Sequence, residues 1–215
     1  MIKISPSILS ANFLNLEADI KYLNEYADYF HLDIMDGVFV PNISFGFPIC
    51  EAIATKAEIP LDVHLMIVNP GNYIDKVANI KGVEMISFHL EAVKEPIPLL
   101  NKIKSYGIKA GLVINPDVPV LELEPYFEFC DYVLIMSVQA GFGGQSFNPN
   151  TYERLSQARE IINNKNLTCE LQVDGGVSLK NSSALIAAGA NILVSGTSVF
   201  TAQNPGQYIK DLRGE

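Results

Sequence analysis

Two short segments of the sequence pair an imidazole with a carboxylate at the same spacing. His31 and Asp33 stand two positions apart, and so do Asp62 and His64. Both pairs lie in apolar segments typical of β-strands. Side chains two positions apart on a strand point to the same face. We therefore expect each segment to present an imidazole and a carboxylate together.

A further carboxylate, Asp174, ends another apolar segment and precedes Gly175-Gly176. Two imidazoles and two carboxylates form an N2O2 ligand set that suits one divalent metal ion such as zinc, iron(II), manganese or cobalt. Asp62 could orient a ligand rather than be one. The third histidine of the chain, His89, could support the site, contact a substrate or be a satisfied core residue.

Glycine-rich segments follow three later strand-like segments. They are Gly141-Phe142-Gly143-Gly144, Gly175-Gly176 and Gly196-Thr197-Ser198. Glycine lets backbone N–H groups approach an anion closely, and a helix that starts after Gly196 would add a positive dipole. One such segment is also what a tight turn needs, but three on neighbouring strands favour a phosphate site.

The strand-like segments recur along the chain with amphipathic segments between them. The predicted strands cover 3–8, 29–34, 61–67, 83–89, 109–114, 131–137, 171–174 and 192–195. Eight such repeats in this length predict one (β/α)8 TIM barrel domain over residues 1–215. A doubly wound open sheet is the alternative, but no GxGxxG motif follows the first strand. In a barrel, all the polar strand ends face one mouth.

Helices are predicted between these strands. One follows Asn15, four cover 48–56, 70–80, 96–106 and 118–127, one opens at Asn148-Pro149, and one runs from Ser178 to Gly189. Proline at the first helical position and glycine after the last are typical helix boundaries.

Composition excludes several classes of partner. The 215 residues are 48% hydrophobic, with a formal net charge of −9 and no cluster of Lys and Arg. We therefore expect no binding to nucleic acid. No apolar segment is long enough to cross a membrane, and the N-terminus has no secretory pattern. The three cysteines form no CxxC pair and are expected as buried free thiols. These features predict a cytoplasmic protein.

The positions of Asp33 and Asp174 suggest a reaction. They belong to the second and seventh predicted strands, which lie three steps apart around a closed ring. The two carboxylates could therefore reach a substrate from opposite sides. One could remove a proton from a carbon and the other return one, while a metal polarises the neighbouring carbonyl. This chemistry inverts a stereocentre next to a ketone.

The ordered motifs of the chain closely resemble the ribulose-phosphate 3-epimerase family. The motifs are Ser5-Pro6-Ser7-Ile8-Leu9, His31-Leu32-Asp33-Ile34-Met35-Asp36-Gly37, Phe39-Val40-Pro41-Asn42, Asp62-Val63-His64-Leu65-Met66, Gly141-Phe142-Gly143-Gly144-Gln145 and Val173-Asp174-Gly175-Gly176. The resemblance runs from about Ile4 to Phe200. It implies a barrel that interconverts D-ribulose 5-phosphate and D-xylulose 5-phosphate in the pentose phosphate pathway, and a homo-oligomer.

The resemblance also assigns roles to residues. It implies metal ligands at His31, Asp33, His64 and Asp174, with Asp33 and Asp174 as the two proton-transfer groups. The implied substrate contacts are Ser7, His64, Asp174, Gly141 to Gly144, Gly175, Gly176, Gly196 and Thr197. Met35, Met66 and Met136 match methionines that line the reacting carbon. Pattern alone would place these methionines in the core.

The chain departs from the family at three places. Gln139-Ala140 stands where a proline usually precedes the glycine loop, Val38 replaces a polar residue, and Leu90 follows His89 in place of a small residue or proline. These departures leave room for a different sugar, and D-allulose-6-phosphate 3-epimerases share most of the motifs.

Two other function classes are less well supported. Related phosphate-barrel lyases favour a strand-two Asp-x-Lys-x-x-Asp arrangement, but Ile34-Met35 stands between the aspartates here. A non-catalytic sugar-phosphate sensor would not need two proton-transfer groups on opposed strands.

Overall fold

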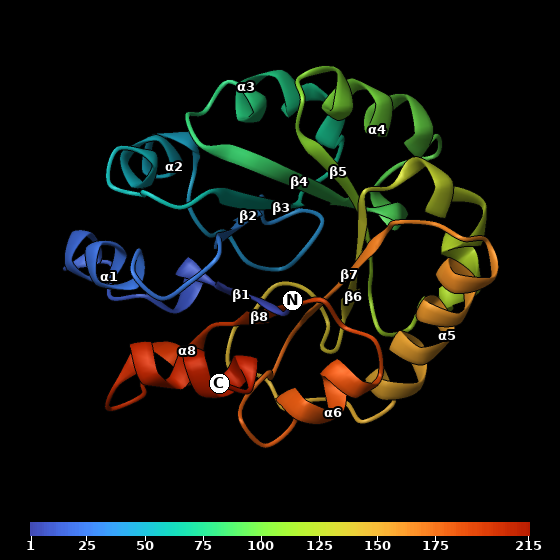
Figure 1. The fold of residues 1–215 in the computed structure, drawn as a ribbon. Helices are drawn as coiled ribbons and strands as arrows, with labels where there is room; N and C mark the ends of the chain where they lie inside the picture. The colour runs from blue at the N-terminus through green and yellow to red at the C-terminus, as the bar shows by residue number, and fades with distance from the viewer.

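Eight parallel strands form one sheet that curls into a barrel inside a ring of helices (Figure 1). The computed structural model describes residues 1–215. The strands are β1 (Lys3–Pro6), β2 (Phe30–Met35), β3 (Leu61–Met66), β4 (Val83–His89), β5 (Lys109–Ile114), β6 (Tyr132–Met136), β7 (Glu170–Asp174) and β8 (Ile192–Ser195). β1 pairs with β8, and a bridge between Ser7 and His31 closes the ring toward β2. The predicted (β/α)8 TIM barrel is confirmed.

Helices and 3-10 turns connect successive strands on the outside of the barrel (Figure 1). The helices are α1 (Leu16–Leu23), α2 (Phe47–Ala54), α3 (Ile74–Ala78), α4 (Pro96–Ser105), α5 (Thr151–Asn164), α6 (Ser182–Ala187), α7 (Thr197–Phe200) and α8 (Pro205–Arg213). The 3-10 helices are η1 (Ile8–Ser10), η2 (Pro70–Asn72), η3 (Leu90–Ala92) and η4 (Val120–Phe129). None of the helices has both the length and the apolar character that a membrane span requires.

The alternation along β2 explains why polar residues reach the barrel interior. Phe30, Leu32 and Ile34 belong to the large apolar core between the sheet and the helices. Every residue of β2 is buried, so the intervening His31 and Asp33 are enclosed inside the barrel. The expected shared face of His31 and Asp33 is therefore confirmed.

Two helices begin later than predicted, because a turn precedes each of them. The helix expected to open at Asn148-Pro149 begins at Thr151, because Asn148 and Pro149 form a preceding turn. Ser178 is not the cap of α6. The cap position is Asn181, whose Oδ1 accepts a hydrogen bond from the Ser178 amide.

Two predicted helices are wholly or partly of the tighter 3-10 type, and one helix was not predicted. The segment 118–127 forms η4, with Pro125 inside it, and the segment 70–80 divides into η2 and α3. Proline lacks the amide that a regular helix interior needs. The additional α8 starts with an Asn204 side-chain cap and ends at Gly214, which has φ 87°. These are typical helix boundaries.

The ring of Tyr132, at the start of β6, requires a glycine at the position opposite it on β5. Tyr132 is fully buried, and a Cβ added at Gly111 on the neighbouring strand would lie within 2.7 Å of ring carbon Cε1 of Tyr132. Real Cβ atoms do not approach carbon so closely. The Tyr132 ring therefore occupies the volume that a side chain at position 111 would take.

We expect Gly111→Ala to lower the free energy of unfolding by about 1–3 kcal/mol, because overpacking displaces a ring that cannot move outward. Denaturant unfolding measures this change. Gly71→Ala is the matched control, since its Cβ would lie at an ordinary 3.5 Å from Leu99. Equal stability of the two variants would contradict the packing argument.

Candidate active site

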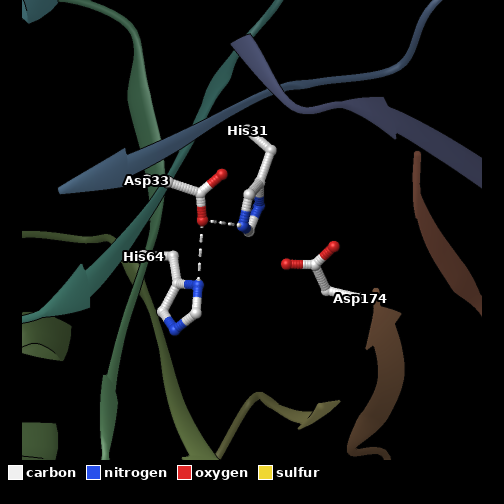
Figure 2. Close-up of side chains that lie close together, drawn as sticks. All are labelled: His31, Asp33, His64 and Asp174. Atoms are coloured by element: carbon white, nitrogen blue, oxygen red, sulfur yellow. Dashed lines mark hydrogen bonds and ion pairs between the residues drawn. The ribbon is translucent and has the colours of Figure 1, made fainter. Parts of the chain in front are cut away.

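Four side chains from three strands converge at the mouth of the barrel. They are His31, Asp33, His64 and Asp174, and one ligand atom from each lies within 4.8 Å of the others. Figure 2 shows His31, Asp33 and His64 on one side and Asp174 facing them from the other. Two imidazole nitrogens and two carboxylate oxygens at this spacing could hold a divalent metal with modest contraction.

The register between β2 and β3 pairs each imidazole with a carboxylate. His31 stands opposite Asp62, and Asp33 stands opposite His64. His31 Nδ1 lies 2.7 Å from Asp62 Oδ2, and His64 Nδ1 lies 3.2 Å from Asp33 Oδ1. The order is His-x-Asp on β2 and Asp-x-His on β3. The parallel register therefore places an imidazole opposite a carboxylate at both positions.

Asp62 orients His31 and is not part of the four-residue group. Its Oδ2 accepts hydrogen bonds from His31 Nδ1 and from Gln172 Nε2, and its side chain is fully buried. A carboxylate behind an imidazole fixes which ring nitrogen carries the proton. The other nitrogen, His31 Nε2, is buried without a hydrogen bond and lies 3.3 Å from Asp33 Oδ1. This unpartnered donor atom fits a metal ligand.

Asp33 is held by groups that favour its ionised form. Ser7 donates a hydrogen bond from Oγ to Asp33 Oδ2 at 2.6 Å. Burial alone would raise the pKa of Asp33, but the charge and hydrogen bond of His31, with His64, hold that pKa well below its usual range. Burial also opposes a charge on His31, yet Asp62 and Asp33 together raise the His31 pKa well above its usual value.

Asp174 has the opposite environment. Burial raises the pKa of its carboxyl to about 7, and the negative charge of Asp33 adds to the rise. Burial lowers the pKa of His64 to about 4, despite its hydrogen bond to Asp33. In the protein without metal, Asp33 is therefore ionised while Asp174 retains its proton up to neutral pH. Carboxyls with such different pKa values are suited to base and acid roles.

A cavity of about 950 Å³ opens beside this group. Its walls bring together predicted residues from both halves of the chain. They include Ser7, Asp33, Met35, Met66, Met136, Gly141, Phe142, Gly143, Gly144, Asp174, Gly175, Gly176, Gly196 and Thr197. The three methionines end β2, β3 and β6 and are buried in a small apolar cluster at the cavity. A sugar phosphate fits such a mixed surface.

The glycine loops converge opposite the carboxylates. A Cβ at Gly175 would lie 2.6 Å from Val138 Cγ2, and Gly175 has φ 107°, so glycine is required there on both counts. Ser10 Oγ lies 3.2 Å from Thr197 Oγ1. The segments after β1, β6, β7 and β8 thus form one wall rich in backbone amides and hydroxyls, which suits an anion.

The sequence analysis did not identify several residues of this site. Gln172 supports Asp62, Ser44 Oγ donates to the backbone oxygen of Asp33, and Asn115 contacts His89. His89 itself lies outside the four-residue group and contacts His64. Asn115 follows a predicted strand end and could have been found by that signal. Gln172 could not, because its partner depends on the register across the barrel.

Comparison with known proteins identifies the family. The family model described as "Ribulose-phosphate 3 epimerase family" matches residues 3–200 of this chain. The chain is 41% identical over 216 residues to the ribulose-phosphate 3-epimerase of Bacillus subtilis, with 100% of this chain and 99% of that protein covered. The chain belongs to the ribulose-phosphate 3-epimerase family. It is also 42% identical over 215 residues to the Synechocystis sp. ribulose-phosphate 3-epimerase, covering 99% of this chain and 93% of that protein.

Similarity to solved structures supports the barrel and nothing finer. A mutant tryptophan synthase alpha-subunit from Pyrococcus furiosus superposes with a TM-score of 0.71 at 19% identity, covering 100% of both chains. Identity this low shows a common fold only. The ribulose-phosphate 3-epimerase family assignment therefore rests on the sequence relatives, which are named as isomerases of a carbohydrate phosphate.

The pKa of Asp174 predicts a pH dependence of stability for this ribulose-phosphate 3-epimerase family member after chelation. An unfolded aspartate titrates near pH 3.9, whereas the folded carboxyl titrates at about 7. Between these values only the folded state holds the proton. Stability should therefore fall as pH rises from about 4 to about 7, by up to about 1.4 kcal/mol per pH unit.

Urea unfolding of metal-free protein across this pH range measures the effect. Asp174→Asn should lose this part of the slope, while Asp211→Asn, at an exposed position of α8, should keep it. The same slope in wild type and Asp174→Asn would remove Asp174 as the titrating group.

Proposed function

We propose that this protein epimerises C3 of a ketose phosphate, interconverting D-ribulose 5-phosphate and D-xylulose 5-phosphate. The observation that supports the proposal most directly is the contrast between its two carboxyls. Asp33 is held ionised and Asp174 is held protonated on facing sides of one buried group (Figure 2). Family membership supports the substrate, because the relatives are named for ribulose phosphate.

The proposed metal ligands are His31, Asp33, His64 and Asp174. Their donor types and their mutual distances fit one divalent ion, and buried His31 Nε2 has no hydrogen bond, its one polar neighbour being Asp33 Oδ1 at 3.3 Å. When bound, such an ion polarises the substrate carbonyl and stabilises negative charge on its oxygen. Zinc, iron(II), manganese and cobalt all suit this ligand set.

Proton transfer is assigned to the two aspartates. Starting from one epimer, ionised Asp33 accepts the C3 proton, and protonated Asp174 donates its own proton to the opposite face of the carbon. The configuration at C3 inverts, and Asp33 and Asp174 exchange protonation states. The reverse reaction starts from that second state, and exchange with solvent restores the first. Ser7 Oγ donates to Asp33 Oδ2 and so orients the base.

The phosphate is assigned to the wall formed by Gly141 to Gly144, Gly175, Gly176, Gly196 and Thr197. Backbone amides and the Thr197 hydroxyl supply neutral donors, which fits a protein with net charge −9. Met35, Met66 and Met136 are proposed to exclude water around the reacting carbon. A role in the pentose phosphate pathway, a cytoplasmic location, a single functional domain over 1–215 and a homo-oligomeric state complete the proposal.

A hexulose substrate is the second candidate. The cavity of about 950 Å³ has room for the additional carbon of D-allulose 6-phosphate. The catalytic groups would be the same, so the two sugars differ only in the distance between the reacting carbon and the phosphate.

Proton NMR in D2O with D-ribulose 5-phosphate tests the function. We expect metal-dependent deuterium uptake at C3 together with xylulose 5-phosphate, and loss of both after chelation. The same measurement with D-allulose 6-phosphate ranks the sugars. Absence of exchange at C3 on either sugar, with metal bound, would overturn the epimerase proposal.

Asp174→Asn should abolish turnover, lowering kcat by at least about 10²-fold, because the amide can neither donate nor accept the transferred proton. The Asp174→Asn variant should still bind inorganic phosphate at the glycine wall with near wild-type affinity. Asp211→Asn is the control and should retain full turnover, since this side chain is exposed on α8. Substantial residual epimerisation in Asp174→Asn would exclude the proton-transfer role.

A further inference from the structure

A third buried imidazole, His89, extends the metal side of the site. His89 Nε2 lies 2.9 Å from His64 Nε2, and the two rings stack with centroids 5.0 Å apart and planes 23° apart. Both side chains are fully buried, and the Phe39 ring packs on His89 with ring centroids 4.8 Å apart. Only one hydrogen can lie between the two nitrogens, so His89 constrains the orientation and the tautomer of His64.

Asn115 holds the far side of His89. Its Nδ2 lies 3.3 Å from His89 Nδ1 and 3.0 Å from Glu91 Oε1, while its Oδ1 accepts a hydrogen bond from the Ala140 amide at 2.9 Å. Glu91 requires a donor and the Ala140 amide requires an acceptor. These two partners together fix the direction of the Asn115 amide.

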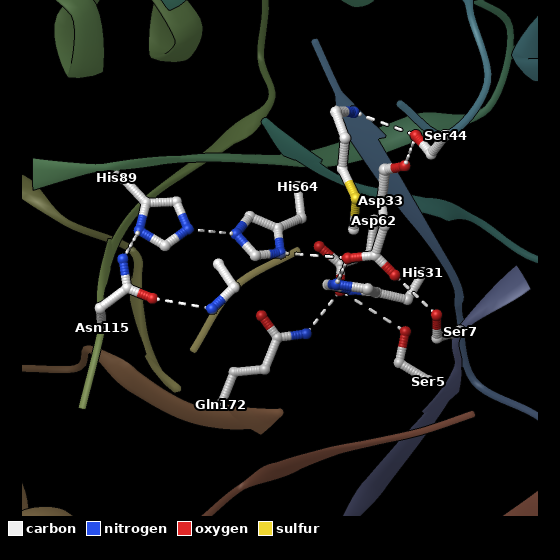
Figure 3. Close-up of polar contacts among 12 residues, drawn as sticks. Ser5, Ser7, His31, Asp33, Ser44, Asp62, His64, His89, Asn115 and Gln172 are labelled. Carbon is white, nitrogen blue, oxygen red and sulfur yellow. Dashed lines mark hydrogen bonds and ion pairs between the residues drawn. The ribbon is translucent and has the colours of Figure 1, made fainter. Parts of the chain in front are cut away.

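Ala140 is the residue before the glycine loop that lines the substrate cavity. One continuous chain of hydrogen bonds therefore runs from Asp33 through His64, His89 and Asn115 to the start of that loop (Figure 3). Proline at position 140 would have no amide hydrogen to donate. The contact at the loop end thus depends on the residue that this chain has there.

We propose that Asn115 and His89 are positioning residues that tie the metal side of the site to the phosphate side. The proposal rests on the proposed function, since it takes His64 as a metal ligand and the Gly141 to Gly144 loop as a substrate contact. A metal on His64 Nδ1 leaves the ring hydrogen on Nε2, which donates to His89 Nε2. His89 Nδ1 then carries its hydrogen toward Glu91 Oε1, 3.7 Å away, which Asn115 holds through its backbone and side-chain amides. Displacement of the loop start moves Asn115, which changes the support of His89 behind His64. The two halves of the site therefore hold each other in register.

Loss of the tie should change two measurable quantities, the dissociation constant for Co2+ and KM for D-ribulose 5-phosphate. Groups behind a metal ligand usually change metal affinity by 10- to 100-fold when removed. We expect Asn115→Ala to raise the Co2+ dissociation constant about tenfold and to raise KM for D-ribulose 5-phosphate. Competition with a chromophoric chelator measures the first in the absence of substrate, and the visible spectrum of bound Co2+ reports the geometry at His64.

Ala140→Pro tests the loop end alone, because it removes one amide donor and no side chain of the metal group. It should raise KM and also weaken Co2+ binding, by a smaller factor than Asn115→Ala. Gln139→Ala is the matched control on the same loop, since the Gln139 side chain donates to Asp117 and not to the histidine chain. Its Co2+ affinity should equal that of the wild type.

The outcomes separate the tie from the proposed function. Wild-type protein that binds no Co2+ and shows no C3 exchange overturns the proposed function. The tie alone is overturned by a different result: wild-type protein binds Co2+ and exchanges C3, but the Co2+ affinities of Asn115→Ala and Ala140→Pro stay within about twofold of the wild-type affinity. Thermal unfolding checks that each variant is folded. If Asn115→Ala does not fold, Ala140→Pro decides the question by the same criterion.

Discussion

The site depends on placing a carboxylate, Asp33, inside a barrel where burial disfavours its charge. Its relative exposure is only 3%, so the charge must be compensated by neighbouring groups. His31, His64 and the Ser7 hydroxyl provide this compensation from three different segments. Both imidazoles are in turn held by another group, since Asp62 holds His31 and His89 contacts His64. The polar interior of the barrel mouth follows from this requirement.

Much of the site is readable from the sequence because a strand has a period of two. His31 with Asp33 and Asp62 with His64 had to share faces once β2 and β3 were recognised. A parallel barrel then brings all the strand ends to one mouth. The spacing alone could not decide whether Asp62 or Asp33 belongs to the metal group, and only the family resemblance favoured Asp33. The choice depends on depth along the barrel axis, since the Asp33–His64 pair lies two positions further toward the mouth than the His31–Asp62 pair.

Gln172 was missed because its partner comes from a distant strand. Gln172 reaches Asp62 across 110 positions of the chain, and no local pattern encodes that contact. The role of His89 was left open for the same reason. Helix boundaries were missed for a different cause, since the turns before α5 and α6 form their own hydrogen bonds, such as the one from the Ser178 amide to Asn181 Oδ1.

The contrast between Asp33 and Asp174 arises from unequal surroundings of the same functional group. Asp33 is close to two imidazoles and a hydroxyl, whereas Asp174 is close to the negative charge of Asp33 and has few compensating donors. Ionising one therefore hinders ionisation of the other. This coupling supplies one base and one acid from two aspartates at neutral pH.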